Sequence, residues 1–269
     1  NISEKQYDDF CIFCDELLQE SHHNRARFAN TILHVIREHP IFLKKYSSLY
    51  NKTQTSFYFF LLFLLFKNLI TSLFKFFDAI FRNYFLKDKL NFKQDKYSNI
   101  FVSHFLNKSF VDNKEDFYFF SLPEKTQNKN DKSLCLLINY TSKISIEINN
   151  ELQKNKVVTE VLPRYLPLLK EIEIRFLLFI DFINILKINT NTVFKKRLKY
   201  LSAIEALSSS SHSNLRIPFL VKERTKNMNP KKVFTTFEGH PWERLLFSFL
   251  REKTPKIHCV GYQHALIFR

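Results

Sequence analysis

The chain has 269 residues, of which 45% are hydrophobic and 25% charged, and this balance excludes a disordered chain. The length allows one large domain or two small ones, with room for a buried core. The formal net charge of +15 attracts polyanions, which include nucleic acid, anionic lipid headgroups and phosphate-bearing substrates. The lysines are spread along the chain without a basic block interleaved with aromatic residues, so we do not expect nucleic acid as a partner.

The first 97 residues are predicted to form a helical region. In residues 1–50, apolar positions such as Phe10, Phe13 and Leu17 recur at helical spacing. This spacing favours an amphipathic helix over a zinc site at the C-x-x-C pair Cys11 and Cys14. A structural zinc site needs two ligand pairs at a suitable spacing, and the nearby histidines do not supply one. We therefore expect no metal, buried thiols elsewhere in the chain, and a reducing, cytoplasmic compartment.

Residues 56–86 are the most hydrophobic stretch of the chain. The uninterrupted apolar run 57–66 is shorter than the roughly twenty residues that cross a bilayer. The charges that follow, which are Lys67, Lys75, Asp78 and Arg82, fall within about 80° of one helix face. Two interpretations remain open. Either the wide apolar face packs against the domain, or the helix lies on an anionic membrane surface.

From residue 98 the pattern changes to alternating strands and helices. The predicted strands are Asn99–Phe105, Asp116–Leu122, Ser133–Thr141, Lys156–Leu162, Lys232–Phe237 and Lys256–Gly261. The predicted helices cover about 142–154, 167–188, 193–209, 214–224 and 241–252, with the serine run 208–211 taken as a loop or a helix end. Buried strands that alternate with helices predict an α/β fold, with a mostly parallel sheet covered by helices on both faces.

Polar side chains follow the predicted strands at their carboxyl ends, where ligands bind in such sheets. From these we take His104, Asn139, His240 and Gln263 as candidate substrate-binding residues. Glu238 is the candidate general base, because a carboxylate at a strand end can accept a proton from a sugar hydroxyl. His264 is the second candidate catalytic residue, for proton transfer or for donation to a phosphate. Ser103, Thr141 and Arg164 also follow strands, but for these the sequence favours polar residues without a role in binding or catalysis.

The chain contains two glycines, Gly239 and Gly261, and both follow predicted strands in its last 31 residues. In a chain with so few glycines, each is expected to meet a backbone need, either a positive φ or the close approach of another group. After Gly239, Pro241 suits a first helical turn, and Glu243 would cap or brace the loop at the helix N-terminus. Trp242, the single tryptophan, either packs beneath the loop or stacks on a ligand.

Residues 232–244, followed by a helix and then by Cys-Val-Gly-Tyr-Gln-His at 259–264, resemble bacterial surface-carbohydrate biosynthesis proteins of O-antigen and capsule clusters. Those proteins look like GT-B-type glycosyltransferases. The strands at 100–104 and 137–141 are also similar to the first strands of that family. The resemblance covers about residues 98–269 and is most specific in the last forty.

The resemblance implies a Rossmann-like acceptor-side domain at 98–269 and a second, donor-binding domain that this chain lacks. It further implies a metal-independent enzyme without a cofactor, which uses a nucleotide sugar and a lipid-linked or saccharide acceptor. The enzyme would be cytoplasmic or peripheral on the inner membrane. Because the chain begins with Asn and stops soon after the last predicted strand, we expect a fragment that is inactive alone.

Three other interpretations stay open at this stage. The chain could be a non-catalytic polysaccharide assembly or export protein with the same fold, or a basic nucleic-acid-binding protein. It could also be a plain α/β domain in which the motif after the strand is only a turn.

Overall fold

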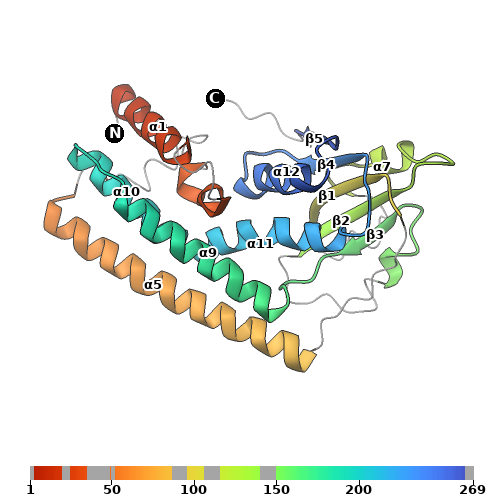
Figure 1. Cartoon of the computed structure of the whole chain (residues 1–269), viewed down its shortest axis with the longest axis horizontal. Coiled ribbons are helices and arrows are strands. Elements are labelled where there is room, and N and C mark those ends of the chain that lie inside the picture. Colours follow the sequence, from red (N-terminus) through yellow and green to blue (C-terminus); the bar gives the residue numbers. More distant parts are fainter. Residues whose placement is uncertain are drawn as a thin grey trace.

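A five-stranded, fully parallel sheet organises the protein. The computed structural model describes residues 3–19, 25–34, 49, 52–86, 96–105, 116–139 and 150–263. The strands are β1 (Asn99–Phe105), β2 (Ser133–Asn139), β3 (Val158–Val161), β4 (Lys232–Thr236) and β5 (His258–Tyr262). They are ordered β3-β2-β1-β4-β5, with every pair parallel (Figure 1). The predicted α/β class with a Rossmann-like parallel sheet is confirmed.

Helices flank this sheet and form most of the rest of the molecule. The long helices are α1 (Glu4–Gln19), α5 (Gln54–Phe81), α9 (Leu168–Lys187), α10 (Val193–Ala206), α11 (Ser209–Arg224) and α12 (Pro241–Lys253). The short helical segments are η1 (Arg25–Ala29), η2 (Thr31–Leu33), the π-helical η3 (Arg82–Leu86) and α7 (Leu122–Lys125).

The two faces of the sheet have different covers. On one face, Ile100, Val102 and Leu136 belong to a large core that includes buried side chains of α9, α11, α12 and η1. On the other face, Phe101 stacks on Phe234 with ring centroids 4.4 Å apart. The segment before α7 covers this second face in part, since the Phe119 ring meets the Phe101 ring edge-on at 5.2 Å.

The predicted strand Asp116–Leu122 is wrong. A single bridge joins Asp116 to Phe120, and α7 begins directly after it, with Pro123 in its first turn. The Asp116 carboxylate accepts the backbone N–H groups of Tyr118 and Phe119, both at 2.8 Å, and so bends the chain into a turn. Apolar composition alone favoured a strand, but this side-chain-to-backbone bonding competes with strand pairing.

The start of one helix also differs from the prediction. Of the two alternatives for the serine run, the helix end is correct, because the Ser208 hydroxyl caps α11 by accepting the N–H of Ser211 at 3.1 Å. Helix α11 therefore begins at Ser209, five residues before the predicted start at Asn214. The helix predicted at about 142–154 lies largely outside the described residues, and of its range 150–152 are described as helical.

The N-terminal helices share a core with the rest of the chain. Buried side chains of α1, η2 and α5 join Leu198, Leu201 and Ile204 of α10 in one cluster. Cys14 is buried in α1 and Cys11 is half-buried. Across the described ranges, no group of three or more His, Cys, Asp or Glu side chains could hold a metal ion.

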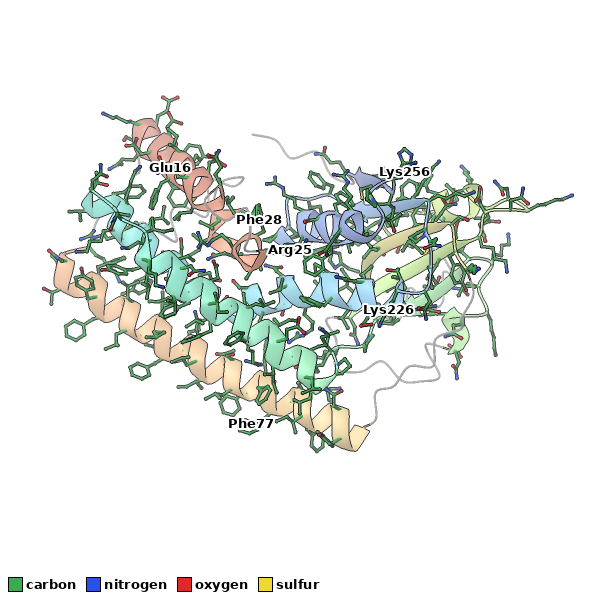
Figure 2. The ribbon with its side chains drawn as sticks, viewed as in Figure 1. Glu16, Arg25, Phe28, Phe77, Lys226 and Lys256 are labelled. Atoms are coloured by element: carbon green, nitrogen blue, oxygen red, sulfur yellow. The ribbon has the colours of Figure 1, made fainter. Side chains whose placement is uncertain are left out.

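Beyond its first turns, which bury Phe57 and Leu61, helix α5 turns most of its polar side chains toward the protein and its apolar face outward. The inner stripe bonds to neighbouring helices: the Asn68 amide donates to the Ile204 carbonyl at 3.1 Å, and Asp78 accepts the Tyr165 hydroxyl at 2.6 Å. The outer face consists of exposed side chains, Phe77 among them (Figure 2), and we call it the α5 outer face. Its members are Tyr58, Phe59, Leu62, Phe63, Phe66, Leu69, Ile70, Leu73, Phe74, Phe77, Phe81 and Tyr84.

Of the two open interpretations, packing against the domain holds for the first turns of α5, where Phe57 and Leu61 are buried, but not for the α5 outer face. The surface beneath α5 offers carbonyl, hydroxyl and guanidinium groups, and these pair with the polar stripe instead. By length and composition alone, residues Gln54–Tyr84 form one helical stretch of 31 residues that is apolar enough to cross a membrane.

Candidate functional site

The carboxyl ends of β1 and β4 meet at the point where the strand order reverses. From β1 the chain continues to β2 and β3 on one side, whereas β4 and β5 lie on the other. Ligands bind in the crevice at such a switch point. Among the predicted site residues, His104 ends β1, and Glu238 and His240 follow β4. The rings of His104 and His240 are 6.3 Å apart, and His240 Nε2 lies 3.6 Å from Glu238 Oε2.

The loop after β4 is built around the buried carboxylate of Glu243. Glu243 accepts the backbone N–H groups of Glu238, at 3.1 Å, and of His240, at 2.9 Å. Gly239 permits the tight turn between them with a φ of 86°, a region that favours glycine. Because backbone groups satisfy Glu243, the side chains of Glu238 and His240 are left to face outward, 31% and 45% exposed.

Two further motif residues have structural roles in this loop. Trp242 is 1% exposed and lies beneath His104, with the two rings perpendicular at 5.5 Å. Gly261 faces the ring of Phe237, because a Cβ at this position would lie 2.9 Å from Phe237 Cγ. Each glycine thus meets one of the two expected backbone needs, a positive φ at Gly239 and a close approach at Gly261.

The environment keeps His104 neutral. Burial, helped by His240, lowers the pKa of His104 to about 4. A neutral imidazole can accept or donate one hydrogen bond, which suits contact with a hydroxyl. Beside it, burial first and then the charges of Glu238 and Asp116 raise the pKa of Tyr118. The ring of Tyr118 meets the His104 ring at 5.7 Å, so a phenol borders the same cluster.

Sequence reasoning missed Tyr118 and Asp116. Asp116 accepts a hydrogen bond from the Ser103 hydroxyl and thereby fixes the turn that carries Tyr118 next to β1. The sequence did contain a sign of this turn. An aspartate two residues before the tyrosine has the spacing of an Asx turn, in which the carboxylate accepts the N–H of the second residue after it. The apolar run after Asp116 obscured this signal.

The remaining candidates are not part of this cluster. Asn139 ends β2 and lines a different cavity together with Arg164. Gln263 is exposed directly after β5, one strand away from Glu238. His264 lies outside the described residues. The structure therefore brings together Glu238, His240 and His104, and it separates Asn139 from them.

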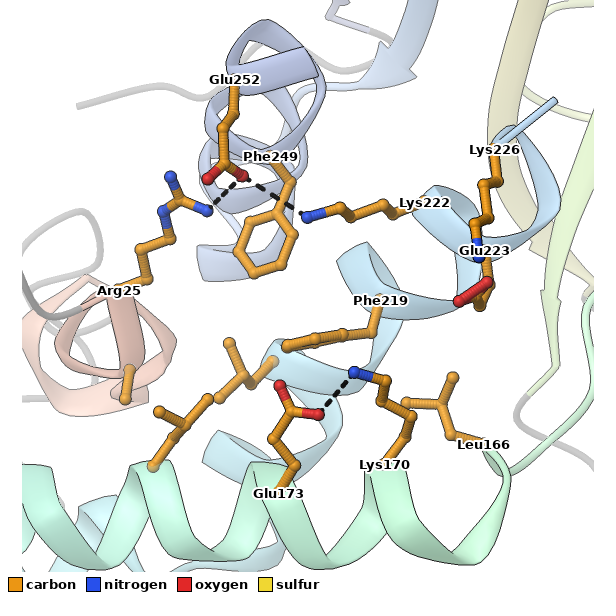
Figure 3. Close-up of a pocket in the computed structure, with 13 residues that line it drawn as sticks. Arg25, Leu166, Lys170, Glu173, Phe219, Lys222, Glu223, Lys226, Phe249 and Glu252 are labelled. Atoms are coloured by element: carbon orange, nitrogen blue, oxygen red, sulfur yellow. Dashed lines mark hydrogen bonds and ion pairs between the residues drawn. The ribbon is translucent and has the colours of Figure 1, made fainter. Parts of the chain in front are cut away.

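A larger cavity of about 660 Å³ lies among η1, α9, α11 and α12, with Phe219 and Phe249 in its wall (Figure 3). Three of its cations are paired: Glu252 lies 2.7 Å from Arg25 and 3.4 Å from Lys222, and Lys170 lies 2.6 Å from Glu173. These pairs neutralise one another, and Glu223 and Lys226 are the remaining charged residues of the wall. We therefore place the candidate chemistry at the switch point.

Glu243 should make stability depend on pH. Burial raises the pKa of Glu243 to about 7, although the N–H groups of Glu238 and His240 oppose this shift. Because the pKa is higher in the folded than in the unfolded chain, the stabilisation is complete below about pH 4.5 and is lost as the pH rises through 7. We expect the unfolding free energy of the wild type, relative to Glu243→Gln, to fall by about 3 kcal/mol between about pH 4.5 and 8.

Urea unfolding across this pH range measures the difference. Glu151→Gln, at an exposed position, is the control and should give a curve parallel to that of the wild type. Parallel curves for Glu243→Gln as well would contradict the assigned pKa.

Comparison of the chain with protein-family models, with curated proteins and with solved structures gave no match.

Proposed function

We propose that the chain is the acceptor-side part of a glycosyltransferase of bacterial surface-polysaccharide assembly. The observation that carries the proposal is the carboxylate–imidazole pair at the switch point of a Rossmann-like sheet. Glu238 and His240 face outward there from a loop that Glu243 holds from within. Such a preorganised pair is suited to deprotonate a hydroxyl group.

In the proposed reaction, an acceptor hydroxyl forms the new bond to the anomeric carbon of the donor. The bond from that carbon to the nucleoside diphosphate breaks, and the diphosphate keeps the bonding electrons. Glu238 accepts the hydroxyl proton, and His240, 3.6 Å away, orients the carboxylate. Neutral His104 and the Tyr118 hydroxyl line the acceptor side. Gln263 and His264 remain predicted residues of the donor side, whose diphosphate a second domain would bind, as in the family that residues 232–264 resemble.

The same proposal places the protein on the inner face of the bacterial membrane. The α5 outer face carries twelve exposed apolar or aromatic side chains, whereas Asn68 and Asp78 on the other side of the helix bond to groups within the protein. Helix α9 adds exposed Ile172 and Phe179 on either side of Arg175, which hydrogen-bonds to Ser72 of α5. A bilayer surface fits this orientation, and the net charge of +15 favours anionic headgroups. A lipid-linked acceptor would then be held near the site.

The catalytic assignment predicts that Glu238→Gln lowers turnover by about a hundredfold, because the amide cannot accept the proton. Sugar transfer from a panel of nucleotide sugars to extracted lipid-linked acceptor, with the full-length protein, measures this effect. The matched control is Glu223→Gln, since Glu223 lines the cavity of Figure 3. Full activity of Glu238→Gln would leave a non-catalytic assembly protein as the better interpretation. Loss of activity in Glu223→Gln alone would move the site to that cavity.

A further inference from the structure

A second, smaller cavity of about 110 Å³ lies on the same edge of the sheet as the candidate site. It is lined by Asn139 at the end of β2, by Arg164 and Tyr165 after β3, by Lys75 of α5, and by Ser213 and Arg216 of α11. The register pairs Ile138, also in its wall, with His104, so the two sites lie on neighbouring strands. The volume is comparable with that of one phosphate group.

Positive charge exceeds negative charge around this cavity. The side chains in and next to its wall include five cations and two carboxylates, which are Lys75, Arg82, Arg164, Arg175, Arg216, Glu171 and Asp78. Glu171 is fully engaged by Arg216, with oxygen-to-nitrogen distances of 2.7 and 3.0 Å. Asp78 binds Arg82 at 3.1 Å and the Tyr165 hydroxyl at 2.6 Å, so Arg164 approaches it only to 3.9 Å.

Lys75 is the cation of this wall whose surroundings most favour an anionic ligand. Its side chain points inward on the polar stripe of α5, and no described residue forms a hydrogen bond or ion pair with its ammonium group. Burial, and after it the charges of Arg216, Arg164 and Arg175, lower the pKa of Lys75. A half-buried ammonium group that shares a cavity wall with the guanidinium groups of Arg164 and Arg216 is unfavourable unless an anion joins them.

We propose that this cavity binds a phosphate-type anion, with Lys75 and Arg164 as its principal cationic contacts. Arg164 is 29% exposed and so offers a guanidinium group to an entering ligand, and the Asn139 amide can add an N–H donor. The anion is either the phosphate of a membrane lipid or a soluble phosphate compound. A lipid source is considered because Lys75 belongs to α5, the helix that we propose to lie on the membrane, and Arg164 is exposed at the same cavity. The site does not depend on sugar transfer, so it can be tested apart from the proposed function.

Calorimetric titration of the full chain with inorganic phosphate and with pyrophosphate, at low salt, tests the site. The wild type should bind, and Lys75→Met should weaken binding by at least about tenfold. The control Lys232→Met removes the same charge from an exposed position at the opposite, amino-terminal edge of the sheet, and it should bind as the wild type does. Lys75→Met should also unfold at the same or a higher temperature without ligand, because it removes like-charge repulsion. Absence of binding, or equal affinity in Lys75→Met, would overturn the proposal.

Vesicles distinguish the two sources of the phosphate. Vesicles of phosphatidylcholine with phosphatidic acid expose a phosphate monoester, whereas those with phosphatidylglycerol expose only a diester. The ligand is a lipid headgroup if the wild type binds vesicles with phosphatidic acid more tightly than those with phosphatidylglycerol, and if both pyrophosphate and Lys75→Met abolish this preference. Pyrophosphate binding that needs Lys75, together with equal binding of both vesicles, identifies a soluble ligand. Lys75→Met that changes neither measurement rejects the site for both.

Discussion

Replacing Phe63, Phe74 and Phe77 together with Ser is expected to weaken binding to phospholipid vesicles by at least about a thousandfold. These side chains are 65%, 71% and 62% exposed on the α5 outer face, so the folded protein does not need them for packing. Each would contribute about 1.5–3 kcal/mol on entering a bilayer. Ser and Phe have similar helix propensities, so the unfolding free energy should change little. Cosedimentation with sucrose-loaded vesicles measures the partition.

The control is a variant with three exposed apolar side chains on other elements changed to Ser. Ile12 of α1 and Phe117 and Phe120 of the turn before α7 are 56%, 51% and 52% exposed and lie outside α5. This variant should bind vesicles as the wild type does. Equal binding by both variants would remove the membrane proposal. A third outcome is that the wild type is a dimer, the α5 variant is a monomer, and neither protein binds vesicles. The α5 outer face would then be a protein interface.

The orientation of α5 illustrates what the sequence could not determine. The sequence shows a narrow polar stripe and a wide apolar face, and in a soluble protein the apolar face usually packs inward. Which face packs depends on the surface opposite. Here that surface presents the Ile204 carbonyl, the Arg175 guanidinium and the Tyr165 hydroxyl. These groups are distant in the sequence and come together only in the fold.

The sheet itself could be predicted in large part. Five of the six predicted strands are present, because long apolar runs bounded by polar residues are distinctive in a chain of buried parallel strands. The sixth, Asp116–Leu122, was wrong because the Asp116 carboxylate binds nearby N–H groups and makes a turn. The two glycines could be interpreted from the sequence because each meets a local need of the backbone. Gly239 has a positive φ, and Gly261 is in close contact with Phe237, and other residues fit poorly in either position.

The candidate site could be predicted only to the level of one sheet edge. Parallel strands place all their carboxyl ends together, which is why His104 and Glu238 could both be proposed from the sequence. Strand order decides which of these ends are neighbours, and local pattern does not reveal it. Even between neighbouring strands the register matters: Asn139 pairs with Phe105 and not with His104, and it lines the smaller cavity together with Arg164. Tyr118 was missed because its position beside His104 depends on the Asp116 turn.

The largest effect on stability is expected from Glu171→Gln, which should lower the free energy of unfolding by about 3–5 kcal/mol. Glu171 is fully buried and accepts two hydrogen bonds from Arg216 and one from the Leu166 N–H. Without its charge, the Arg216 side chain, 7% exposed, would be buried beside other cations and have no carboxylate to compensate it. Burying an unpaired charge costs far more than losing a surface pair.

Urea unfolding followed by circular dichroism measures this loss, and Glu252→Gln is the control. Glu252 also binds two cations, but its side chain is 46% exposed, so its removal should cost less than about 1 kcal/mol. The double variant Glu171→Met with Arg216→Met should recover more than half of the loss, because both buried charges are then absent. Similar losses in Glu171→Gln and Glu252→Gln would contradict the argument. Glu171 also supplies negative charge next to the smaller cavity, whose wall contains Lys75 and Arg164. Added phosphate should therefore raise the unfolding free energy of Glu171→Gln more than that of Glu252→Gln.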